Sequence, residues 1–145
     1  MRDWIDFYDS AHSIYVNARH RDVHFRRLAE DLAAYVRPGA AALDYGCGEA
    51  LRADIVAAKA GRLILVEPAP GVRARVAARF AQEPKIEVCG PERIARLTDR
   101  SIDVVIMHSV AQFVIRQLWE PTCRNRRNIK MKVVSKYPGL SITKA

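Results

Sequence analysis

The sequence predicts an α/β fold with a doubly wound, mostly parallel sheet and helices on both faces. Three observations support this prediction. Short apolar runs alternate with helical patterns, the first run ends in a glycine-rich turn, and the second ends in an acidic residue. The first run, 40–45, leads through Gly46 and Gly48 into a helical pattern, and the second run, 62–67, ends at Glu67, 21 residues after Gly46. Strand and helix patterns that alternate in this way are typical of parallel sheets built from crossover units.

The expected elements follow in order along the chain. A helix is predicted over about 17–36, because apolar side chains recur there at spacings of three and four, at Phe25, Leu28, Leu32 and Tyr35. Further helices are expected over about 50–60, capped by Gly61, and over about 72–81. Strands are expected at about 40–45, 62–67, 85–89 and 102–107.

Length and composition indicate one globular domain. The chain has 145 residues, of which 50% are hydrophobic, and no apolar run approaches the roughly 20 residues that a membrane span needs. The first residues lack the apolar core of a signal peptide. Three scattered cysteines, Cys47, Cys89 and Cys123, imply no disulfide framework. We therefore expect a cytoplasmic protein without a membrane partner.

The positive charge is concentrated at one end of the chain. Residues 116–145 carry eight basic residues and one acid, whereas the other 115 carry 16 basic and 15 acidic residues. We expect an N-terminal helical cap segment at 1–39, an α/β core at 40–118 and a basic, atypical tail at 119–145, within a single domain.

The glycine turn predicts an adenosine-type ligand. Glycine at 46 and 48 allows a sharp turn and a close approach of a ligand to the backbone. An acid about 20 residues further on, at the tip of the second strand, is placed to accept hydrogen bonds from ribose hydroxyls. A dinucleotide fits less well, because Leu51 replaces the third glycine of that pattern and Glu49 would oppose a pyrophosphate.

The stretch Leu43-Asp44-Tyr45-Gly46-Cys47-Gly48-Glu49-Ala50 resembles the first motif of class I S-adenosylmethionine-dependent methyltransferases, L-D-x-G-C-G-x-G. Ala50 stands where that family has its last glycine. A second stretch, 99–107, resembles the family's fourth strand, D-x-S-x-D-x-V. The resemblance covers roughly 1–118 and implies that strand one lies centrally, beside strands two and four. Beyond it, the family's fifth strand and antiparallel pair have no counterpart, so the C-terminal strands are incomplete.

The resemblance implies S-adenosyl-L-methionine as cofactor and a set of residues around it. Asp44, Gly46, Cys47 and Gly48 would form the cofactor turn, with Cys47 as a small turn residue rather than a nucleophile. Glu67, followed by Pro68, would hold the ribose, and the chain near Glu92 would contact the adenine. His108 and Ser109 would lie near the methionine end.

His108 is the catalytic candidate. Imidazole titrates near neutral pH, so a general base is conceivable, but positioning is the more expected role because methyl transfer often needs only alignment. The cluster Tyr15, Asn17, Arg19 and His20 is a second candidate for contact with substrate, with exposed helix-end residues as the simpler interpretation. No metal site is expected, since His20 and His24 lack further ligands nearby.

The methyl acceptor stays open, with a small molecule preferred. The basic tail suggests a nucleic acid, yet only Trp119 and Tyr137 could stack bases there. Binding of the cofactor without catalysis is an alternative, because the C-terminal part is short, and a dinucleotide-binding protein is a weaker one. Strand four would lie at an exposed edge unless a strand near 129–134 covers it or the chain forms a homodimer there.

Overall fold

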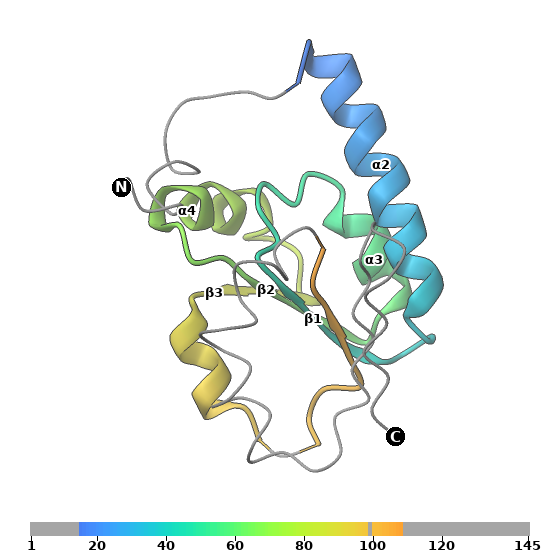
Figure 1. Ribbon diagram of the computed structural model, residues 1–145. Coiled ribbons are helices and arrows are strands. Elements are labelled where there is room, and N and C mark those ends of the chain that lie inside the picture. Colours follow the sequence, from blue (N-terminus) through green and yellow to red (C-terminus); the bar gives the residue numbers. More distant parts are fainter. Residues whose placement is uncertain (1–14, 99, 109–145) are drawn as a thin grey trace, which may run out of the picture.

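The computed structural model describes residues 15–98 and 100–108, and these form a sheet of four parallel strands with helices packed against it (Figure 1). The strand order is β3-β2-β1-β4, with bounds β1 Ala41–Tyr45, β2 Arg62–Val66, β3 Ile86–Cys89 and β4 Val104–Ile106. The predicted α/β class and the central place of the first strand are therefore confirmed. The strand order reverses at β1, and ligands of such sheets bind at the carboxyl ends of the strands beside this reversal.

Three helices cover one face of the sheet: α2 (Ala18–Tyr35), α3 (Ala53–Lys59) and α4 (Pro70–Arg79). Their buried side chains pack with those of alternate strand residues, which include Ala42, Leu63, Leu65, Val104 and Ile106. The other face carries a second core, to which Ile94 of the short 3-10 helix η1 (Pro91–Arg96) contributes. Because both faces of the sheet are covered, the strands are apolar almost throughout.

Polar side chains satisfy the ends of the helices. Asn17 is the N-cap of α2, since its Oδ1 accepts a hydrogen bond of 2.8 Å from the backbone of His20. Lys59 Nζ donates to the carbonyl of Ala33 near the end of α2, at 2.8 Å. Lys85 Nζ donates to the carbonyl of Ala60, at 3.0 Å, beyond the end of α3. The positive charges of these two lysines, at the C-terminal ends of α2 and α3, also complement the helix dipoles.

Several predicted boundaries shift for local reasons. The helix expected from residue 50 begins at Ala53, because Ala50 has a positive φ of 43° and residues 51–52 form a turn. The helix expected from residue 72 begins at Pro70, a residue whose fixed φ suits the first helical position. Tyr35, expected on the buried face of its helix, is 41% exposed.

Gly61 has a different role from the helix cap that was predicted. The cap residue of α3 is Ala60, and Gly61 does not adopt a left-handed conformation. A side chain on Gly61 would overlap the carbonyl oxygen of Gly39, while its N–H donates to Ala40 at 2.9 Å. The glycine is needed because two segments of backbone pass very close to each other there.

No helix among the residues that the structure describes is long and apolar enough to cross a membrane. The strand predicted near 129–134, which is the alternative to a homodimer at the edge of β4, lies outside the described ranges. The proposed tail, 119–145, lies outside them as well.

Candidate functional site

The glycine turn follows β1 and is folded back across the end of β2. Gly46 and Gly48 have positive φ angles of 70° and 56°, a region that favours glycine. The N–H groups of Gly46 and Cys47 both donate to the carbonyl of Val66, at 2.7 and 3.3 Å. A side chain on Gly48 would meet nothing within 4 Å. The backbone conformation therefore requires glycine, and the space beside Gly48 is open to a ligand.

Glu67 joins this turn to the loop after β2. Its side chain is buried, with the residue only 5% exposed, and its Oε2 accepts a hydrogen bond from the N–H of Gly48 at 2.9 Å. Its Oε1 accepts from the N–H of Ala69 at 2.8 Å. A carboxylate can accept several hydrogen bonds at once, so an acid in this place can serve the chain and a ligand together. The sequence predicted a ligand-binding acid here but did not predict that the chain itself also uses it.

Asp44 is the second-last residue of β1, on the face of the sheet that the helices cover. Burial, and then the negative charge of Glu67, raise the pKa of Asp44 to about 7. Asp44 lines a cavity of about 40 Å³ whose other walls include Phe25, Leu28 and Val56. That volume holds only a few water molecules, since about 10–15 Å³ of such space is enough for one. A nucleoside-sized ligand must therefore lie beyond the cavity, at the open side of the turn.

Cys47 lies in the turn as a thiol rather than a thiolate. Burial, and then the charges of Asp44 and Glu67, raise the pKa of Cys47 well above its ordinary value. Its Sγ donates weakly to the carbonyl of Gly48, at 3.6 Å. Since the thiolate is the nucleophilic form, this environment is unsuited to nucleophilic chemistry at Cys47.

Glu49 is paired with arginines of α4. Arg75 donates to Glu49 Oε1 through Nε and Nη2, at 3.1 and 2.8 Å. Arg79 donates through Nη1 to the Glu49 carbonyl, and its Nη2 lies 3.4 Å from Glu49 Oε2. The charge of Glu49 is thus matched by the protein, which weakens the electrostatic argument that the sequence offered against a pyrophosphate. These two arginines were not identified from sequence, although their spacing of four residues places them on one face of a helix.

The remaining predicted cofactor residues lie at the same ends of the strands. Pro68 belongs to the loop after β2, where Arg73 Nη1 donates to the carbonyls of Glu67 and Pro68 at 2.8 and 3.3 Å. Glu92 is exposed in the first turn of η1, and its carboxylate lies so close to Gly90 that a side chain there would overlap it. Both residues follow strands that run parallel to β1.

His108 is half-buried and lies two residues after β4. β4 pairs with β1 in the register Asp44 to Ile106, so His108 follows β4 at the edge of the sheet where the glycine turn follows β1. Ser109, the other residue predicted near the methionine end, lies outside the described residues.

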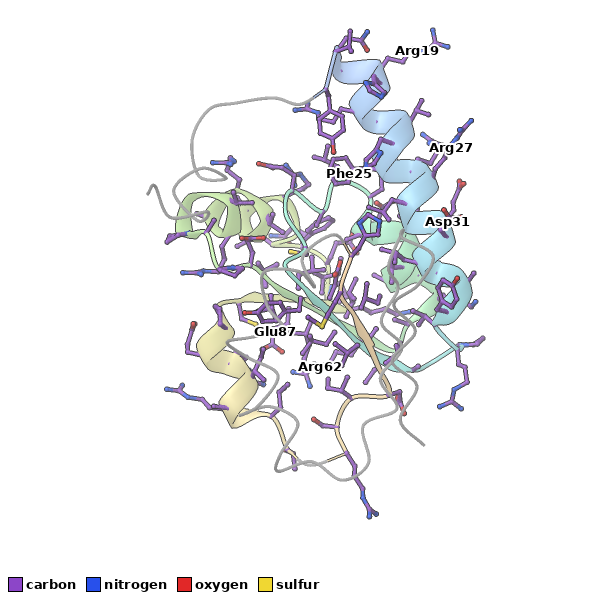
Figure 2. The ribbon with its side chains drawn as sticks, in the orientation of Figure 1. Arg19, Phe25, Arg27, Asp31, Arg62 and Glu87 are labelled. Carbon is purple, nitrogen blue, oxygen red and sulfur yellow. The ribbon has the colours of Figure 1, made fainter. Side chains whose placement is uncertain are left out.

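Among the N-terminal candidates, Tyr15 packs against aromatic rings of α2. The ring of Tyr15 lies 5.8 Å from that of His20, 5.4 Å from that of His24 and 5.8 Å from that of Phe25, centroid to centroid. Asn17 caps α2 with its side chain. Figure 2 shows Arg19 and Arg27 on the side of α2 that faces away from the sheet, and Phe25 on the inner side. For Asn17 and Arg19, the geometry favours the simpler interpretation of helix-end residues.

This parallel sheet, with a positive-φ glycine turn after β1 and an acid after β2, has the architecture of class I S-adenosylmethionine-dependent methyltransferases. A family model described as a methyltransferase domain matches residues 43–128, and the chain belongs to that family. A comparison with curated proteins found no match.

Solved structures of methyltransferases share this fold at low sequence identity. One is phosphoethanolamine N-methyltransferase 1 from Haemonchus contortus, in complex with phosphoethanolamine and S-adenosylhomocysteine. It matches with a TM-score of 0.56 and 16% identity, over 72% of this chain and 24% of that one. A second, a SAM-dependent methyltransferase from Aquifex aeolicus, has a TM-score of 0.55 and 14% identity over 90% of this chain and 70% of that one.

A third is magnesium protoporphyrin IX methyltransferase from Synechocystis PCC 6803 with bound SAM, with a TM-score of 0.51 and 17% identity over 74% of this chain and 61% of that one. The chain thus spans about a quarter of the first of these structures and less than two thirds of the third.

Proposed function

We propose that this domain binds S-adenosylmethionine at the carboxyl ends of β1 and β2 and transfers its methyl group to a small-molecule acceptor. The observation that carries the proposal is the link between Glu67 and the glycine turn: a buried carboxylate accepts from the N–H of Gly48 at 2.9 Å, beside open space. This arrangement supports a ligand that brings hydroxyl donors to the acid and lies close to the turn backbone.

Each candidate residue has a defined task in this proposal. Gly46 and Gly48 let the cofactor approach the backbone, and Glu67 accepts hydrogen bonds from the ribose hydroxyls. Above its pKa of about 7, Asp44 supplies negative charge next to the turn for the cationic methionine end. Pro68 shapes the ribose loop, and the chain near Glu92 borders the adenine.

The cofactor, when bound, supplies a methyl group that is already attached to a good leaving group. The protein therefore has to align the acceptor with this methyl group and keep water away from it. His108 lies at the correct end of β4 for this task, and we assign it a positioning role. A small acceptor is supported by the solved structures whose names specify phosphoethanolamine and magnesium protoporphyrin.

A matched pair of glycine variants tests the cofactor site. Gly48→Ala and Gly39→Ala both place a methyl group at a positive φ, 56° and 77°, and neither methyl group would meet an atom within 4 Å. Each variant should lose about 1–2 kcal/mol of stability from the left-handed conformation. Gly48 follows β1 at the ligand end, whereas Gly39 precedes it. Only Gly48→Ala should lose S-adenosylmethionine binding, measured by calorimetry.

Equal affinity of both variants would show that the ligand does not approach Gly48. A panel of small acceptors with labelled cofactor then measures methyl transfer by the wild-type chain. Cofactor binding without transfer to any acceptor would favour the binding-only alternative. Binding of a nicotinamide dinucleotide in place of S-adenosylmethionine would overturn the proposed function.

A further inference from the structure

The glycine turn has a strained backbone that needs support from outside. Three of its residues have positive φ angles: Gly46 at 70°, Gly48 at 56° and Ala50 at 43°. For Ala50, a residue with a Cβ atom, this conformation costs roughly 1–2 kcal/mol relative to the right-handed region. Ala50 is nevertheless buried, at 8% exposure, so the turn does not relax by moving it into solvent.

Two of the supports come from β2 and the residue after it. The carbonyl of Val66 accepts from two N–H groups of the turn, and Glu67 accepts from Gly48. Both act on the first part of the turn. The last part, 49–50, is held from a different element, because Glu49 contacts only α4 among the ion pairs that the structure describes.

The contacts with α4 fix both the side chain and the backbone of Glu49. Arg75 binds one carboxylate oxygen with two nitrogens, at 3.1 and 2.8 Å, and Arg79 donates to the backbone carbonyl as well as facing the second oxygen. The Glu49 and Arg79 side chains are each 32% exposed, and that of Arg75 is 51% exposed. Charge-assisted bonds with several donors in a fixed fork restrict orientation more than one ammonium group could.

We propose that Arg75 and Arg79 are positioning residues for cofactor binding, which act through Glu49 by holding the glycine turn in its strained conformation. This inference rests on the proposed function. It also assigns Glu49, the acid that pairs with α4, a task in a cofactor site. The arginines contact the turn from outside and need no contact with the cofactor.

A double-mutant cycle of Glu49→Gln and Arg75→Gln tests the proposal, with Arg79→Gln as a third variant that also loses the carbonyl contact. Arg27→Gln is the matched control, because it removes the same charge from an exposed helix position that points away from the sheet (Figure 2). Hydrogen exchange of the amides at 46–50 reports on the turn itself, and amides of β2 report on general stability.

We expect each single variant to accelerate exchange in the turn and to weaken S-adenosylmethionine binding, both by about five- to tenfold, with β2 unchanged. The Glu49→Gln/Arg75→Gln double variant should be no worse than the worse single variant, because both remove one interaction. Turn exchange equal to that of Arg27→Gln, effects that multiply, or faster exchange with unchanged affinity would each overturn the positioning role. If the wild-type chain binds no S-adenosylmethionine, the proposed function fails, and turn exchange alone then decides whether the arginines hold the turn.

Discussion

At the scale of single residues, two carboxyl groups at the ends of neighbouring strands lie in different surroundings. Glu67 has backbone donors for both of its oxygens, at 2.9 and 2.8 Å. Asp44 is half-buried against apolar side chains of α2 and α3, next to the charge of Glu67. A protein that keeps an acid in such a place loses stability when that acid ionises, so Asp44 is a residue whose presence needs a functional reason.

The raised pKa of Asp44 should be visible in how the stability of the protein depends on pH. Its pKa is raised from 3.8 to about 7, so between these values the folded chain keeps a proton that the unfolded chain has released. The contribution of Asp44 to the free energy of unfolding is therefore highest below pH 4, and it falls as the pH rises towards 7. Asp44→Asn should remove this slope and be more stable than the wild type above pH 7, in urea titrations at several pH values.

Asp31→Asn is the control for that measurement, since Asp31 is exposed on α2 (Figure 2). Parallel pH profiles for Asp44→Asn and the wild type would contradict the prediction. The same substitution should weaken S-adenosylmethionine binding, because the ligand would lose a negative charge beneath its cationic end.

Glu67 should matter to both stability and binding. In Glu67→Gln one carboxylate oxygen becomes an amide group, which cannot accept from a backbone N–H, so one buried donor loses its partner. We expect a loss of about 1–3 kcal/mol in stability and a comparable loss in S-adenosylmethionine affinity. Thermal unfolding with and without ligand separates the two effects. Unchanged affinity in a folded variant would remove Glu67 from the ligand site.

At the scale of elements, α4 organises the site more than its length suggests. Three of its arginines reach the loops that follow β1 and β2: Arg73 binds the carbonyls after β2, and Arg75 and Arg79 bind Glu49. The inner side of the same helix buries Val72 and Val76. One helix therefore joins the hydrophobic core to the loops that would hold a ligand.

The 3-10 helix η1 is attached to the sheet by an ion pair rather than by apolar contacts alone. Arg93 Nε donates to Glu87 Oε1 at 2.8 Å, and Arg62 of β2 contacts the other oxygen of Glu87 (Figure 2). Burial raises the pKa of Glu87, but the hydrogen bonds from Arg62 and Arg93 outweigh it, and the pKa lies below its usual value. The pairing thus favours the ionised acid, and the contribution of Glu87 to stability should fade as the pH falls through its lowered pKa.

Before β1, the backbone of Gly39 passes so close to Gly61 that one added methyl group should destabilise the fold. In Gly61→Ala the new methyl would overlap the backbone of Gly39, which cannot move without disturbing β1. We expect a loss of about 1–3 kcal/mol from this overpacking, measured by urea unfolding. Gly90→Ala is the matched control, since the atoms nearest to its methyl group would be the flexible carboxylate end of the exposed Glu92. Similar losses in both variants would contradict the close-approach argument.

At the scale of the whole molecule, the described sheet has β3 and β4 at its two edges. Two of the three residues of β4, Val104 and Ile106, are buried at 6% and 0% exposure, as in an interior strand. We predict that a strand near 129–134 or a second copy of the chain lies beside β4, because an apolar edge strand otherwise invites association.

Deletion of residues 122–145 tests this arrangement. We expect the shortened chain to unfold at a lower temperature or to self-associate, measured by calorimetry and by light scattering at several concentrations. The deletion removes seven of the eight basic residues of 116–145, so a chain of matched length with those seven changed to Gln is the control for charge. A monomeric deletion variant of unchanged stability would show that another segment protects β4.

The sequence by itself determined the class of fold, and its resemblance to a known family gave the central place of the first strand. Apolar runs of strand length, the glycines at 46 and 48 and the acid at 67 are local signals, and their meaning depends on spacing along the chain. The boundaries of α3 and the exposure of Tyr35 were predicted less well, because they depend on the conformation of Ala50 and on which side of α2 the sheet covers.

Only the tertiary structure showed which polar groups of the chain form hydrogen bonds and ion pairs with each other. The bond from Gly48 to Glu67 joins residues 19 apart, and the contacts of Arg75 and Arg79 with Glu49 join residues 26 and 30 apart. The sequence contained every one of these residues, but an ion pair has no period or spacing that marks it in advance. It forms because the crossover of a parallel sheet returns α4 to the same edge as the glycine turn, and this return is a property of the whole fold.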